Sequence, residues 1–334
     1  MFSKNTIYPT LIIIAGFLTR LININQPILE TAGWRQCYTA SIARNFYYNG
    51  MNIFYPQVSY GGNTAGYIGG AEFNLYPFMV ALLYKVFGVH ECLGRLASII
   101  AFCGGAFFLY KLTKKYAGTT SGLITLLFFT FNPYIFFYSR AFQPESAMLF
   151  FSIAMLYFFS EWIDKEGWWR FTLMTLFATL AFLVKIPTIC LGLPLLYLCL
   201  QKYKLNVLKQ WKLWIFTAVS ILLTFLWYNH SNYLKTIEGG ISNNTLSFTY
   251  YVFEYSIYYA MRFSFYKKVF FNEVFEKDLI YVGGVFFVLG IIFTLRKREF
   301  RYIHYWLLAI LVYFFIAAKE VEWHTYYTIP IIVP

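Results

Sequence analysis

Charged residues are scarce in this chain, and their scarcity excludes a soluble globular protein. Only 13% of the 334 residues are Asp, Glu, Lys or Arg, whereas 59% are hydrophobic and the mean hydropathy is +0.55. This composition supplies too little polar surface to cover a water-soluble globule of that length. The chain is therefore predicted to be an all-α polytopic membrane protein.

Cysteine pairs and nucleotide-binding motifs are also lacking. The five cysteines form no CxxC pair and four lie within or beside apolar segments, which argues against a metal cluster or a disulfide framework. The glycines at 61, 62, 66, 69 and 70 show neither GxGxxG spacing nor a terminal GK[ST], so they predict a flexible segment and no phosphate loop. The net charge of +12 lies largely in short loops, which indicates membrane orientation and no nucleic-acid partner.

The apolar segments predict a bundle of about nine or ten transmembrane helices, each needing about 20 mostly apolar residues. The first is expected to stay as an anchor, because no small-residue cleavage site precedes the polar loop that follows it. A tenth is expected to begin at Tyr327, so a truncated chain is an open alternative. The nine candidates are 7–22, 92–110, 117–136, 146–163, 171–184, 188–200, 213–228, 279–295 and 303–318.

Cation asymmetry decides the topology. If segment 73–89 does not cross the membrane, the predicted cytoplasmic loops hold 13 cations, against only Arg140 and Lys185 in the short outer loops. Cytoplasmic loops are the basic ones in membrane proteins. Segment 73–89 is therefore predicted to be an interfacial or re-entrant helix on the outer side. Within one domain, 1–334, the long outer loops are then 23–91, the catalytic loop, and 229–278.

The first outer loop combines a carboxylate with a cation beside the bilayer. Glu30 and Arg35 lie five residues apart, and charged groups at a membrane surface must be solvated or paired, so they suggest a site for a polar substrate. Trp34, Tyr38, Ile42 and Phe46 recur at helical spacing, which predicts a helix lying in the interface. Packing against the bundle alone explains this stripe equally well.

These residues carry a resemblance to a known family. Glu30 followed by Trp34-Arg35-Gln36 and by Thr39 to Phe46 resembles the first-loop motif of the dolichyl-phosphate-mannose protein mannosyltransferases and the aminoarabinose transferases, which are GT-C membrane glycosyltransferases. The resemblance implies a GT-C-type bundle with juxtamembrane helices in the first outer loop. Further matching blocks are Glu72 to Pro77, Phe87-Gly88, Arg95, Tyr138 to Arg140, Pro144-Glu145, Lys185 to Pro187 and His324 to Tyr327.

Catalytic roles follow from the resemblance. It implies that Glu30 is the general base, with Glu where the family commonly has Asp, and that Glu145 is the second acidic residue. Glu145 also fits a helix N-terminal cap, because it follows Pro144 at the start of a span. Arg35, Lys185 and Arg140 are implied to bind the donor phosphate, although snorkelling toward lipid headgroups is the ordinary alternative for each.

Other positions are implied to shape or complete the site. Trp34, Gln36 and Tyr326 match positions around the acceptor. Glu72 and His324 match metal-binding positions of the aminoarabinose-transferase branch, which leaves a divalent metal open. One carboxylate and one imidazole are an incomplete zinc set, and no other cofactor is indicated.

The sequence thus predicts an inverting hexosyl- or pentosyltransferase that moves a sugar from a polyprenyl-phosphate carrier to an extracytoplasmic protein, lipid or glycan. The expected location is the bacterial inner membrane, with the site facing outward. A transporter or flippase of lipid-linked saccharides is the main alternative, but it would place ionisable residues near span centres, where this chain has almost none. An inactive, truncated relative is the third possibility.

Overall fold

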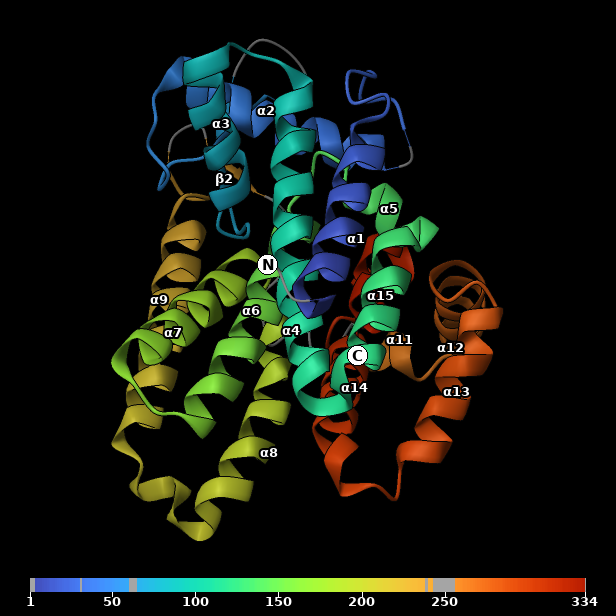
Figure 1. The fold of residues 1–334 in the computed structure, drawn as a ribbon. Coiled ribbons are helices and arrows are strands. Elements are labelled where there is room, and N and C mark those ends of the chain that lie inside the picture. The colour runs from blue at the N-terminus through green and yellow to red at the C-terminus, as the bar shows by residue number, and fades with distance from the viewer. Residues whose placement is uncertain (1–3, 31, 60–64, 238–239, 243–255, 334) are drawn as a thin grey trace.

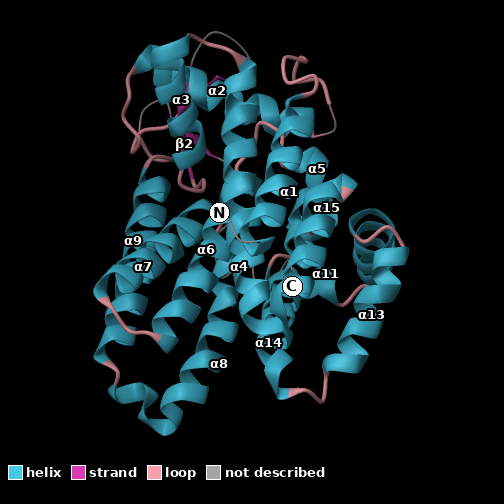
Figure 2. Cartoon of the chain, in the orientation of Figure 1, coloured by secondary structure: helices cyan, strands magenta, loops and turns pink. Residues whose placement is uncertain are grey.

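The molecule is a bundle of helices covered at one end by a smaller layer of two helices and short strands (Figures 1 and 2). Within the residues that the structure describes, four helical stretches are long and apolar enough to cross a membrane, and a pair bent by 108° would make a fifth. The predicted all-α polytopic fold is confirmed. The computed structural model describes residues 4–30, 32–59, 65–237, 240–242 and 256–333.

Each of the nine predicted spans falls on helical structure in the bundle. α6 lies at its centre, packed on α4, α7 and α8, because its side chains are apolar on all sides and can be buried all round. How many of these helices cross a membrane stays a prediction. The bundle helices are α1 (Lys4–Leu21), α4 (Glu91–Phe131), α6 (Glu145–Asp164), α7 (Trp168–Val184), α8 (Gly192–Tyr203), α9 (Trp211–Tyr233), α13 (Val282–Thr294) and α14 (Arg301–Ile316).

Short helices and turns link the bundle helices. Two short 3-10 turns lie around Tyr327, where a tenth span was expected to begin, and that span stays a prediction. The links are α5 (Pro133–Tyr138), η1 (Ile186–Leu191), η2 (Lys204–Lys209), α11 (Ile257–Ala260), α12 (Phe263–Tyr266), η4 (Lys267–Asp278), η5 (Arg298–Phe300), α15 (Ala318–Trp323), η6 (Thr325–Tyr327) and η7 (Ile329–Ile332).

Gly118, the second residue of the predicted span 117–136, divides α4 into two antiparallel halves, which hold the predicted span 92–110 and most of the span 117–136. Its φ is 86°, a value that residues with a Cβ rarely adopt. Phe102 stacks on Phe129 with ring centroids 5.3 Å apart, and a Cβ on Gly122 would lie 3.2 Å from the ring of Tyr110. The chain therefore reverses at Gly118, and the two halves pack along each other.

The outer layer is built from α2 (Gly33–Asn49), α3 (Leu75–Phe87) and a small sheet. Strand β1 (Gln57–Ser59) pairs antiparallel with β2 (Ala65–Gly69), and β2 pairs parallel with β3 (Gly240–Ser242). α3 has 13 residues, or about 20 Å at the helical rise. That length is too short to cross a bilayer core of about 30 Å, in keeping with the prediction that segment 73–89 does not span.

The predicted interfacial helix exists as α2, but its buried face differs from the expected one. Ile42 and Phe46 are buried as predicted, whereas Trp34 is 57% exposed and Gln36, expected to lie away from the apolar stripe, is fully buried. Gln36 is accommodated because its amide oxygen accepts a hydrogen bond from the backbone N–H of Phe142 at 2.9 Å. The packing of α2 was thus predicted only in its second half.

The glycine-rich segment, predicted to be flexible, contains strand β2 and touches the end of α9. A Cβ on Gly69 would lie 2.5 Å from the backbone nitrogen of Lys235, so only glycine allows the two backbones to come so close. In the second predicted loop, 229–278, α9 continues to Tyr233 and β3 joins the sheet of the first loop. Residues 238–239 and 243–255 of that loop lie outside the described residues.

Candidate active site

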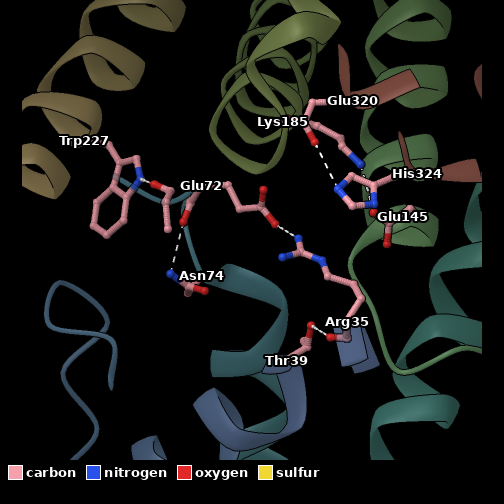
Figure 3. A network of polar contacts seen from close by, with 10 residues as sticks. Arg35, Thr39, Glu72, Asn74, Glu145, Lys185, Trp227, Glu320 and His324 are labelled. Carbon is pink, nitrogen blue, oxygen red and sulfur yellow. Dashed lines mark hydrogen bonds and ion pairs between the residues drawn. The ribbon is translucent and has the colours of Figure 1, made fainter. Parts of the chain in front are cut away.

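Charged side chains from distant parts of the sequence meet between the bundle and the outer layer (Figure 3). Each belongs to a short helix, a helix end or a link between elements. We call this set the polar cluster. Its members are Arg35 of α2, Glu72 between β2 and α3, Glu145 at the start of α6, Lys185 between α7 and η1, Glu320 of α15 and His324 after it.

Lys185 and Glu145 form the most buried ion pair of the polar cluster. Lys185 Nζ donates to Glu145 Oε1 at 2.9 Å, and the two side chains are 4% and 1% exposed. Glu145 also stands in the first turn of α6, where the helix dipole favours a carboxylate. Glu145 therefore lies in the first helical turn, as predicted, but the N-cap residue is Pro144, and the Glu145 carboxylate pairs with Lys185. Glu145 Oε2 is buried without a hydrogen-bond partner among the described residues, which is costly unless a polar ligand reaches it.

Arg35 and Glu72 form the second ion pair, which is more accessible than the first. Arg35 Nη2 donates to Glu72 Oε1, and the side chains are 12% and 24% exposed. Burial alone would lower the pKa of Arg35, but Glu72 foremost, with Glu145 adding to it, holds that pKa above its ordinary value. Arg35 is therefore a permanent cation. The Asn74 side chain supports Glu72 by donating a hydrogen bond to the Glu72 backbone oxygen at 3.0 Å.

His324 and Glu320 form the third pair, with Nε2 and Oε2 3.3 Å apart. Burial lowers the pKa of His324, although Glu320 opposes this shift, so the imidazole is neutral at pH 7. Glu320 was not predicted as a site residue. Its position four residues before His324 was the available signal, because residues at that spacing meet on a helix face.

The three residues predicted to shape the acceptor site are divided between two places. The ring of His324 lies 5.3 Å from that of Trp34 and is stacked at 5.4 Å on that of Tyr326. Trp34 and Tyr326 therefore border the polar cluster. Gln36 is buried and accepts a hydrogen bond from the backbone N–H of Phe142, as described above.

Glu30 and Arg140, predicted as base and phosphate ligand, lie in a separate group around Arg95. Arg95 Nη2 donates to Glu30 Oε1 at 2.9 Å and to the Pro27 carbonyl at 3.2 Å. Arg140 donates to the Asn23 carbonyl at 3.2 Å and interacts electrostatically with the Glu30 carboxylate. The fully buried Arg95 thus ties the start of the first loop to α4 and draws Glu30 toward itself.

Two hydroxyl groups fix the link that precedes Glu145. Ser98 Oγ donates to the Ala141 carbonyl at 2.7 Å and approaches the Gln143 carbonyl at 3.3 Å. Tyr76 Oη lies 2.8 Å from Ser98 Oγ. Neither Tyr76 nor Ser98 was predicted to serve the site, although Tyr76 belongs to one of the matching blocks. Together they set where α6 begins and hence where Glu145 stands.

The arrangement does not fit a metal site. In the described part of the chain, no three His, Cys, Asp or Glu side chains are grouped so that they could hold a metal ion. Glu72 is bonded to Arg35, and His324 is bonded to Glu320. The implied metal pair, Glu72 and His324, therefore lacks further ligands, and zinc prefers three or four from the protein.

The sequence is similar to a known protein family and to a further protein. Residues 74–228 match the family described as Dolichyl-phosphate-mannose-protein mannosyltransferase. An uncharacterized protein of Aquifex aeolicus (strain VF5) is 27% identical over 265 residues, which cover 73% of this chain and 59% of that protein.

Two solved structures of ArnT from Cupriavidus metallidurans share the fold. The structure bound to undecaprenyl phosphate has a TM-score of 0.66 at 16% identity and covers 97% of this chain and 57% of the ArnT chain. The apo structure has a TM-score of 0.68 at 16% identity and covers 99% and 58%. This chain thus spans less than two thirds of the length of these relatives. The match over residues 74–228 confirms the predicted resemblance to the mannosyltransferase family over that part of the chain, and the ArnT structures share the fold.

Proposed function

We propose that the chain is an inverting glycosyltransferase that moves a sugar from a polyprenyl-phosphate donor to an acceptor outside the cell membrane. The observation that carries this proposal is the polar cluster, which joins cations and carboxylates at one end of an ArnT-like bundle. The ArnT structure that shares this fold is bound to undecaprenyl phosphate, which supports a donor of that class.

The reaction needs cations for the leaving group. When the acceptor oxygen attacks the anomeric carbon, the bond from that carbon to the phosphate oxygen breaks and the polyprenyl phosphate leaves with the electron pair. Arg35 and Lys185 are suited to bind this phosphate, because cations stabilise the developing charge without a proton transfer. Arg140 is a weaker candidate, since it lies with Glu30 and Arg95.

The reaction also needs a base for the proton of the acceptor hydroxyl or amine. The family resemblance assigns this role to Glu30. Among the carboxylates of the polar cluster the geometry favours Glu72, because it pairs with the proposed phosphate ligand Arg35 and is 24% exposed, whereas Glu145 is 1% exposed. Arg35 already holds Glu72, so a phosphate that takes over Arg35 would release this carboxylate. Donor binding would then free the base for proton transfer.

The sidedness of the site is part of the proposal. The polar cluster lies on the side of the outer layer, at the opposite end from η2 and the link between α13 and α14 (Figure 1). Those two links carry many of the predicted cytoplasmic cations, among them Lys204, Lys209 and Arg298. Since cytoplasmic loops are enriched in Lys and Arg, the polar cluster would face outward, across a bacterial inner membrane.

The test is transfer from a synthetic polyprenyl-phosphate sugar by the purified protein in lipid nanodiscs. Release of polyprenyl phosphate should depend on the protein and on an acceptor, and the product should have the inverted anomeric configuration. Lys185→Ala should weaken use of the donor, while Lys209→Ala, an exposed lysine on η2, should not. Flipping of labelled donor across the bilayer without any release of polyprenyl phosphate would instead support the transporter alternative.

A further inference from the structure

A hollow of about 320 Å³ lies at the C-terminal end of α2. It is formed by the last turn of α2, by the chain that follows and by strands β1 and β2. It belongs to the outer layer but is separate from the polar cluster. The hollow is lined by Asn45, Phe46, Asn49, Gly50, Asn52, Tyr55, Gln57 and Tyr67.

Among the described residues, the lining of this hollow is polar and carries no charged side chain. Four of the eight residues are carboxamides and two are tyrosines. A phosphate, a carboxylate or an ammonium group would need an opposite charge to repay its desolvation. A neutral molecule with many hydroxyl groups needs only donors and acceptors, which carboxamides and phenols supply.

Three of the carboxamides are held in a fixed arrangement. Asn49 Nδ2 donates to Gln57 Oε1 at 2.8 Å, and Asn45 Nδ2 donates to the Gln57 backbone oxygen at 3.1 Å. The hydrogen bond between the Asn49 and Gln57 side chains does not use Asn49 Oδ1, an acceptor, or Gln57 Nε2, a donor. These two groups are left to bind a ligand. Neighbouring hydroxyls of a sugar ring can bind such a pair, one donating and the other accepting.

The tyrosines add a surface for the apolar face of a sugar ring. Tyr55 and Tyr67 meet edge to face, with ring centroids 5.8 Å apart and an interplanar angle of 74°. Tyr55 also contacts the ring of His230 on α9 at 5.3 Å, so its orientation is supported from a second element. Rigid tyrosines provide apolar area and a hydroxyl at little entropic cost.

The hollow and the polar cluster are joined by one helix. Ten residues of α2 separate Arg35 from Asn45, a distance of about 15 Å at the helical rise. That is too far for one sugar to touch both places, but a short oligosaccharide can reach from one to the other. We propose that this hollow binds a saccharide unit of the acceptor, remote from the bond that forms, and that the acceptor is therefore a glycan.

This inference rests on the proposed function in one respect: only that function makes the bound saccharide an acceptor. Binding of the saccharide is therefore tested without catalysis. The probes are mono- to tetrasaccharides of glucose and of N-acetylglucosamine, titrated calorimetrically into the protein in nanodiscs. At least one oligosaccharide should bind. Asn49→Leu and Tyr67→Ala should each weaken that binding about tenfold, the effect of losing one or two hydrogen bonds or a ring contact.

Matched controls separate the hollow from general surface effects. Asn206→Leu removes an exposed amide from η2, and Tyr48→Ala removes an exposed ring from α2 outside the lining. Both should bind as the parent does. Tyr67→Phe keeps the ring and should lose less than Tyr67→Ala. If no oligosaccharide of either series binds, or if Asn49→Leu and Tyr67→Ala bind like the controls, the inference is wrong.

Transfer kinetics form the second arm of the test. With a glycan acceptor, Asn49→Leu and Tyr67→Ala should raise the acceptor KM about tenfold and leave kcat nearly unchanged, because they remove binding shared by the ground and transition states. A protein that binds oligosaccharides in the hollow but transfers no sugar would keep the binding site and refute the proposed function. If the protein transfers sugar and both variants have an unchanged acceptor KM, the proposed function stands and the hollow is not an acceptor site.

Discussion

Lys185 Nζ lies 2.9 Å from Glu145 Oε1 and 3.8 Å from the ring centre of Tyr327. The two charged side chains are almost completely buried, so each depends on the other for compensation. Removing one partner of such a pair leaves an unpaired charge in a medium of low polarity. The pair therefore links the stability of the outer end of the bundle to its proposed chemistry.

Lys185→Met should destabilise the protein by about 3–5 kcal/mol, because it leaves Glu145 buried without its cation. Adding Glu145→Gln should recover much of this loss while transfer stays low. Unfolding by denaturant in mild detergent measures both effects. Lys209→Met, at an exposed position of η2, is the control. Equal stabilities of Lys185→Met and Lys209→Met would contradict the role given to the ion pair.

Replacing the base by its amide should lower transfer by about 10²–10⁴-fold, the usual scale of general acid–base catalysis. The geometry predicts that Glu72→Gln shows this loss in kcat, and that Glu30→Gln acts mainly on stability by weakening the bond with Arg95. Initial rates of polyprenyl phosphate release distinguish the two variants. A large loss of kcat in Glu30→Gln alone would restore the assignment given by the family resemblance.

Ser98→Ala should lower kcat by roughly tenfold, because the Ala141 carbonyl loses a hydrogen bond worth about 1 kcal/mol and Glu145 is no longer held in register. Tyr76→Phe should have a smaller effect in the same direction, since Ser98 can still donate. Donor KM should rise as well, because Glu145 positions the proposed phosphate ligand Lys185. Ser152→Ala is the control: it removes a buried hydroxyl of α6 that has no partner among the described residues. An equal kcat in Ser98→Ala and Ser152→Ala would refute the positioning role.

Gly118→Ala should destabilise the protein by about 1 kcal/mol or more, because a Cβ is strained at positive φ. Gly192→Ala is the matched control. Gly192 has a φ of −56°, and a Cβ there would meet nothing within 4 Å, so this substitution should be neutral or slightly stabilising. Equilibrium unfolding of the two variants should separate them, and a stable Gly118→Ala protein would argue against the tight turn within α4.

Labelling of introduced cysteines should place the two ends of the bundle on opposite sides of the membrane. Leu29 in the first loop is 88% exposed and Leu205 in η2 is 92% exposed, so a cysteine at either position is accessible to a reagent. In a variant without the native cysteines, Leu29→Cys should react with an impermeant maleimide added to intact cells. Leu205→Cys should react only after permeabilisation. Labelling of both from one side would overturn the predicted topology.

The sequence by itself determined the class of the protein and the positions of its long helices. Long apolar runs can satisfy their backbone only as helices in a membrane, so their number and limits are local properties. The helical spacing of Ile42 and Phe46 likewise predicted α2. The polar segment from Lys111 to Lys115 separated the two apolar runs of α4, whereas the turn at Gly118, within the second run, was not predicted.

The partners of the charged side chains were decided by the tertiary structure. Arg35 pairs with Glu72, and Lys185 pairs with Glu145 forty residues earlier, choices that no local pattern encodes. Glu30, predicted as the general base, pairs with the buried guanidinium of Arg95, a partner that its local sequence does not indicate. A charge taken from water binds whichever partner the packing of distant elements brings within reach. For that reason the polar cluster emerges only when the bundle and its outer layer are assembled.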